Sequence, residues 1–108
     1  MKNEEKLKYD RDEAHQELYR MLAEISDPED IKILLEDLCT YNEVEQMAQR
    51  LFCVKLFLGG LTYSQIIEKI NISSATLSRV SRCFKRGSGG YSKVVKNYFD
   101  GKKDKNDD

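Results

Sequence analysis

The chain of 108 residues has no tryptophan, one proline, one histidine and three cysteines. The chain has a single histidine, His15, and shows neither clustered metal ligands nor a nucleophile-and-base pattern. Cys39, Cys53 and Cys83 are odd in number, widely separated and set among apolar helical positions. This pattern is typical of reduced, packed thiols rather than of a disulfide or a metal site. We therefore expect no enzyme, no metal site and no built-in cofactor.

Long apolar runs are also missing. No segment approaches the length that spans a membrane, and the N-terminus carries no signal-peptide pattern. These absences predict a cytoplasmic protein without a membrane segment. The length fits one domain over 1–108, with the polar ends 1–9 and 100–108 frayed or disordered. So small a domain often gains stability from a partner subunit.

Every strong periodicity in the chain is helical, which predicts an all-α fold of about six helices. Apolar stripes mark the first two helices at Ala14, Leu18, Met21, Leu22 and Ile25, and at Ile31, Leu34, Leu35 and Leu38. Thr40 and Glu43 form a capping-box pattern that opens a third helix, which runs to Gly59 and Gly60. Its apolar residues lie nearly all the way round, so we expect it to be covered on several sides, as in an intertwined dimer.

A helix-turn-helix is predicted at about 62–86. Such a motif needs apolar residues at fixed offsets around the turn, so that two short helices share a small core. Those offsets are occupied by Ile66, Ile70, Ile72, Leu77 and Val80. Thr62 with Gln65 is a capping-box pattern for the first helix, and Ser73 can cap the second.

The second helix, 73–86, is the predicted recognition helix. Its outward face combines hydroxyl and methyl side chains, which allow close approach to a major groove, with cations that bind guanine edges or phosphates. The DNA contacts expected on it are Ser73, Ser74, Ala75, Thr76, Ser78, Arg79, Arg82, Lys85 and Arg86. Taken singly, such residues are more typical of ordinary caps and solvated faces, and only the whole set favours DNA.

The net charge of −1 conceals a strong segregation of charge along the chain. From Met1 to Glu45 there are fourteen acidic and six basic residues, whereas Asn71 to Phe99 holds six basic residues and no acid. The basic segment includes the predicted recognition helix. This coincidence favours a nucleic-acid partner over a simple solvated face.

The run NEVEQMAQRLFCVKLFLGGLTYSQI, followed by SATLSRVSRC and GSGGY, resembles the Trp repressor superfamily and is most similar to its YerC/YecD branch. The resemblance covers about Thr40 to Lys93. It implies an interlocked all-helical homodimer whose two recognition helices enter successive major grooves of a pseudo-palindromic operator. It also implies repression of transcription and operator contacts at Ser74, Ala75, Thr76 and Ser78, with Arg79 and Arg82 beside them.

The same resemblance implies a candidate effector pocket formed by Thr40, Arg50 and Arg79, which match positions around the indole in the tryptophan-binding member. However, Val80 stands where that pocket has a glycine, and Cys83 where it has a serine. Because the added isopropyl group occupies the space of the ring, tryptophan binding would have to displace packed side chains. We therefore expect no tryptophan corepressor.

A competing interpretation remains open. The helix-turn-helix could serve as a dimeric scaffold for binding an acidic protein, without sequence-specific DNA binding. A protein-docking helix more often exposes aromatic anchors, and 73–81 contains none.

Overall fold

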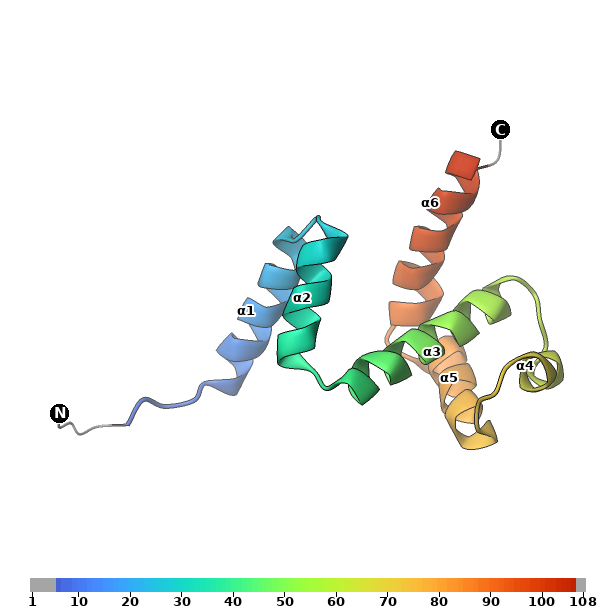
Figure 1. Ribbon diagram of the computed structural model, residues 1–108, viewed down its shortest axis with the longest axis horizontal. Coiled ribbons are helices and arrows are strands. Elements are labelled where there is room, and N and C mark those ends of the chain that lie inside the picture. Colours follow the sequence, from blue (N-terminus) through green and yellow to red (C-terminus); the bar gives the residue numbers. More distant parts are fainter. Residues whose placement is uncertain (1–5, 107–108) are drawn as a thin grey trace. The chain divides into compact units, whose positions relative to one another are not determined.

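The computed structural model describes residues 6–106, which form helices and turns and contain no strand. The helices are α1 (Arg11–Glu24), α2 (Pro28–Leu38), α3 (Tyr41–Leu58), α4 (Tyr63–Lys69), α5 (Ser74–Arg86) and α6 (Lys96–Asn106), with a π-helical segment, η1 (Gly90–Val95), before α6 (Figure 1). The predicted all-α fold of about six helices is confirmed. None of these helices is long and apolar enough to cross a membrane.

Within the chain, two compact units can be distinguished. The first ends at Thr40 and contains α1 and α2, and the second starts at Tyr41 and contains α3 to α6. No residue of α1 or α2 is fully buried.

The ends also differ in part from expectation. Residues 6–10 have no regular structure, whereas α6 continues to Asn106 through a segment expected to be irregular. A hydrogen-bonded ion pair of 2.7 Å joins Lys96 Nζ to Asp100 Oδ2, one helical turn apart. Such a pair favours the helix. The remaining parts of the two predicted frayed ends, 1–5 and 107–108, lie outside the described residues.

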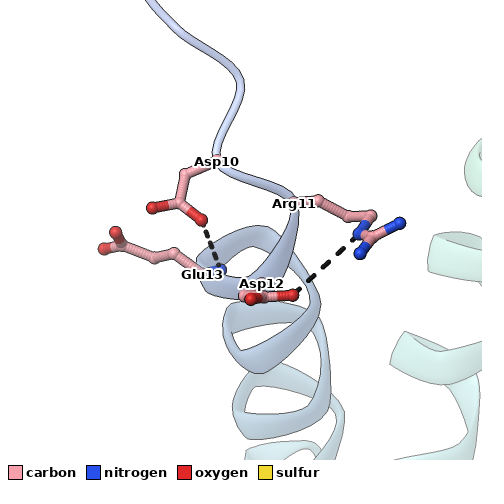
Figure 2. Close-up of polar contacts among 4 residues, drawn as sticks. All are labelled: Asp10, Arg11, Asp12 and Glu13. Carbon is pink, nitrogen blue, oxygen red and sulfur yellow. Dashed lines mark hydrogen bonds and ion pairs between the residues drawn. The ribbon is translucent and has the colours of Figure 1, made fainter.

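Both helices of the first unit begin at an aspartate cap. Asp10 Oδ1 accepts a hydrogen bond of 3.1 Å from the backbone N–H of Glu13, beside a long ion pair between Arg11 and Asp12 (Figure 2). Asp27 Oδ1 accepts from the N–H of Glu29 at 3.0 Å, with Pro28 at the first helical position. These carboxylates satisfy backbone donors at helix starts, where negative charge is also favoured by the helix dipole.

Five fully buried side chains from three helices form the core of the second unit. They are Cys53 and Val54 of α3, Ile66 of α4, and Leu77 and Val80 of α5. Around them lie half-buried side chains, including a stacked pair of rings, Phe57 and Phe84, whose centroids are 5.9 Å apart. Figure 1 shows α5 crossing α3 at this core. Of the apolar offsets predicted for the helix-turn-helix, Ile66, Leu77 and Val80 are confirmed as core residues, and Ile70 and Ile72 are half-buried and pack against them.

The helix α3 ends in a Schellman motif at the predicted glycine pair. The N–H of Gly60 bonds to the carbonyl of Phe57 at 3.0 Å, and the N–H of Leu61 bonds to that of Leu56 at 3.1 Å. Gly60 has φ of +94°, a conformation that costs little only for glycine. This reversal delivers the chain to the start of α4.

The two neighbouring glycines provide a matched test of that turn. We expect Gly60→Ala to lower the free energy of unfolding by about 1 to 2 kcal/mol, because alanine must adopt a left-handed backbone. The cost is conformational, since a Cβ at Gly60 meets nothing within 4 Å. Gly59→Ala, whose Cβ makes only ordinary contacts of 3.5 Å, is the control and should be neutral. Urea titration of both variants measures the difference, and equal midpoints would contradict the assignment.

Burial raises the pKa of the Cys53 thiol, because the charged form loses its hydration in the core. The thiol therefore stabilises the fold below the pKa of the unfolded chain, near 8.5, and this contribution is lost as pH rises through the folded pKa. We expect iodoacetamide to label Cys53 at least about tenfold more slowly than the half-buried Cys39 and Cys83, as mass spectrometry of the peptides would show. Equal rates for the three thiols in the native protein would refute this expectation.

Candidate DNA interface

The first helix of the motif, α4, depends on its cap. Thr62 Oγ1 accepts a hydrogen bond of 3.2 Å from the N–H of Gln65, and Gln65 Oε1 accepts one of 2.8 Å from the N–H of Thr62. The predicted capping box is thus confirmed. A helix of seven residues is too short to persist alone, so this cap and the burial of Ile66 hold it in place.

A tight turn joins α4 to α5. The N–H of Ile72 bonds to the carbonyl of Ile70 at 3.1 Å, which closes a three-residue turn around Asn71. Ser73 then caps α5, because its Oγ accepts from the N–H of Thr76 at 3.1 Å. The same Ser73 hydroxyl donates to Thr76 Oγ1 at 2.8 Å. The side chain predicted to cap the recognition helix is confirmed in that role.

The two faces of α5 differ in chemistry. Leu77 and Val80 are fully buried against α3 and α4. Of the nine residues predicted to contact DNA, Thr76 is half-buried and the other eight are exposed, namely Ser73, Ser74, Ala75, Ser78, Arg79, Arg82, Lys85 and Arg86. The structure therefore places the predicted set at the surface, over the cap and length of one helix.

A shallow basic cleft of about 250 Å³ lies along the second half of this face. Its walls are Tyr63 of α4 and five residues of α5, namely Ser78, Ser81, Arg82, Lys85 and Arg86. Within the described part of the chain, none of the three cations forms an ion pair. Three unpaired cations next to hydroxyl groups can donate hydrogen bonds to phosphate oxygens.

Sequence analysis missed Tyr63. Its hydroxyl donates to the backbone carbonyl of Ser74 at 2.9 Å and lies 3.1 Å from Ser78 Oγ. The ring packs against the buried core, so the phenol spans from the core to the outer face of the motif. Its partners lie 11 and 15 residues away, and the contacts depend on the angle between two helices rather than on a local spacing.

The residues of the candidate effector pocket have different surroundings. Arg50 is half-buried on α3, Arg79 is exposed on α5, and Thr40 is the last residue of the first unit. Val80 has no exposed surface and belongs to the core, with Cys83 half-buried one turn further along α5.

Comparison with known proteins agrees with this architecture. Residues 13–98 match the family model of the Trp repressor protein. The chain is 36% identical over 75 residues to the uncharacterized protein YerC of Bacillus subtilis (strain 168), which covers 69% of this chain and 72% of YerC. It also matches the crystal structure of a candidate Trp repressor from Staphylococcus aureus, with a TM-score of 0.71, 32% identity and coverage of 79% and 85% of the two chains.

The fold and the motif define a helix-turn-helix protein of the class that binds DNA and regulates transcription. Within that class, the chain belongs to the Trp repressor family and is similar to its YerC-like members. This is a family of regulators rather than of enzymes.

Arg82 offers the sharpest test of the basic cleft, because Lys85 and Arg86 lie in the last turn of α5, where cations also stabilise the helix. We expect Arg82→Ala to weaken DNA binding and to reduce the slope of log K against log salt by about one. Fluorescence anisotropy at several salt concentrations measures both quantities.

Arg20→Ala is the matched control, since it removes the same side chain from an exposed site on α1. Its isotherms should overlay those of the unmodified protein. An unchanged slope for Arg82→Ala would show that Arg82 does not bind a phosphate.

Proposed function

We propose that the chain is a sequence-specific DNA-binding transcriptional regulator that acts as a repressor. It binds double-stranded DNA at a pseudo-palindromic operator as a homodimer, through the recognition helix 73–86. The observation that carries this proposal is the outer face of α5, where exposed small hydroxyl and methyl groups lie beside unpaired cations.

Charge supports a DNA partner. Arg79, Arg82, Lys85 and Arg86 are all exposed, and none of them pairs with an acidic residue in the described chain. The segment from Asn71 to Phe99 contains no acid that would neutralise them locally. A surface of this kind attracts phosphates and releases their counterions on binding.

Exposed apolar side chains support the homodimer. In the isolated chain α1 and α2 have no buried residue, and Ile33 and Leu38 of α2 are 51% and 55% exposed. On α3, Leu51 and Phe52 are 40% and 46% exposed. So much uncovered apolar surface is typical of a chain that buries it against another subunit. A second copy also supplies the second recognition helix that a pseudo-palindrome requires.

Binding is proposed to be independent of tryptophan. The isopropyl group of Val80 is fully buried at the position where a ring would need space, and displacing it would cost roughly 1 to 3 kcal/mol. Arg79, exposed on the outer face of α5, is then available to DNA rather than to an indole.

The proposal is tested by selecting sequences from a randomised duplex library with the purified full chain at moderate salt, with and without tryptophan. We expect the same inverted repeat in both conditions, with half-site centres about one DNA turn apart. This spacing reports the homodimer as well as the sequence preference.

Other outcomes point elsewhere. Enrichment only with tryptophan would contradict the effector-independent proposal, and a single unrepeated half-site would contradict the dimer. If the protein retains no sequence of the library in preference to the others, the rival function is favoured, in which the same basic face binds an acidic protein.

A further inference from the structure

The hydroxyl of Tyr63 contacts both the backbone carbonyl of Ser74 and the hydroxyl of Ser78, and the first contact determines which oxygen donates in the second. The carbonyl of Ser74 can only accept a hydrogen bond, and it lies 2.9 Å from the phenol oxygen. Two oxygens at that distance need a proton between them, and only Tyr63 can provide it. The single proton of the phenol is therefore directed at Ser74.

The second contact follows from this proton count. Tyr63 and Ser78 are 3.1 Å apart, and either oxygen could in principle donate. Because the phenol proton is already directed at Ser74, the hydrogen bond must be donated by the Ser78 hydroxyl to the phenol oxygen. Ser78 thus has no proton left for another partner and retains only lone pairs.

Ser78 is exposed on the outer face of α5, so a binding partner can reach its side chain. We propose that Tyr63 is a positioning residue that makes Ser78 a pure hydrogen-bond acceptor toward DNA, selecting the exocyclic amino group of adenine or cytosine. This inference rests on the proposed function, because it requires α5 to lie in a major groove.

The chemistry of the groove makes the distinction meaningful. In the major groove, adenine N6 and cytosine N4 are donors, whereas guanine O6 and N7 and thymine O4 are acceptors. A serine free to rotate can bond to either kind. With its proton held by Tyr63, Ser78 is attracted to the amino groups and repelled by the acceptors.

Thr76 provides an internal contrast on the same helix. Its Oγ1 accepts a hydrogen bond from the Ser73 hydroxyl, and no hydrogen bond donated by the Thr76 hydroxyl is present among the described residues. Thr76 therefore retains a donor, and its behaviour does not depend on Tyr63.

The test uses Tyr63→Phe, which keeps the ring in its packing and removes only the hydroxyl. Tyr98→Phe, the same change at an exposed residue of α6, is the matched control. Selection from the randomised library is repeated with both variants and with Ser78→Ala. The base pair at which Ser78→Ala loses its preference identifies the contact of Ser78.

At that base pair we expect the full chain to prefer one orientation of the pair over the inverted one by about threefold to tenfold. In Tyr63→Phe this preference should fall to near unity, while every other position stays unchanged. Tyr98→Phe should match the unmodified chain throughout.

A second measurement tests the acceptor role directly. A duplex carrying deoxynebularine in place of the contacted adenine, or the 2-pyrimidinone nucleoside in place of cytosine, lacks only the amino group. We expect its affinity for the unmodified chain to fall by about threefold to tenfold, as much as Ser78→Ala reduces binding to the natural duplex. Binding of Ser78→Ala itself should not discriminate between the two duplexes.

The inference alone would be overturned if Tyr63→Phe kept the base preference of the unmodified chain, or if it changed the preference equally at all positions. It would also be overturned if Ser78→Ala changed the preference at no position, or if removal of the amino group left the affinity unchanged. Failure of the unmodified chain to select any sequence would instead overturn the proposed function.

Discussion

Everything in the second unit depends on the mutual burial of five side chains from three helices. Cys53 and Val54 of α3 meet Ile66 of α4 and Leu77 and Val80 of α5, and none of them retains exposed surface. Burial of a side chain of this size contributes roughly 1.5 to 3 kcal/mol, which opposes the entropy lost in ordering these helices. Because α4 has seven residues, its orientation is a consequence of this contact rather than of its own helical propensity.

The core also explains why the outer face of α5 can be polar. A helix with Leu77 and Val80 completely buried on one side is held without help from the opposite side. The residues on the opposite side are therefore free to serve binding. The basic cleft lies on this face, where unpaired cations cost little because they remain hydrated.

Sequence analysis predicted the features that arise from local chemistry. The caps at Thr62 and Ser73, the stop at the glycine pair after α3 and the apolar offsets around Asn71 are short-range patterns, and each is present in the structure. The features it missed depend on tertiary geometry. The bonds of Tyr63 require the crossing of two helices.

In two further segments the backbone conformation differs from what the amino-acid composition suggests. The charged segment after Asp100 was expected to be irregular, yet it continues α6, partly because opposite charges one turn apart can support a helix. The π-helical segment η1 follows Gly89, whose φ is +105° and whose carbonyl accepts from both Lys93 and Val94. The wide turn that follows this glycine has no simple sequence signal.

The separation of the two faces of α5 bears on how such proteins diverge. Substitutions at Ser74, Ala75 or Arg79 leave the buried residues untouched, so new sequence preferences can arise without loss of the fold. Ser78 is the exception, since its proton is shared with a tyrosine on the preceding helix. Under the role proposed for Tyr63, a lineage that exchanged it for phenylalanine would change its preferred sequence while the residues of the outer face of α5 stayed the same.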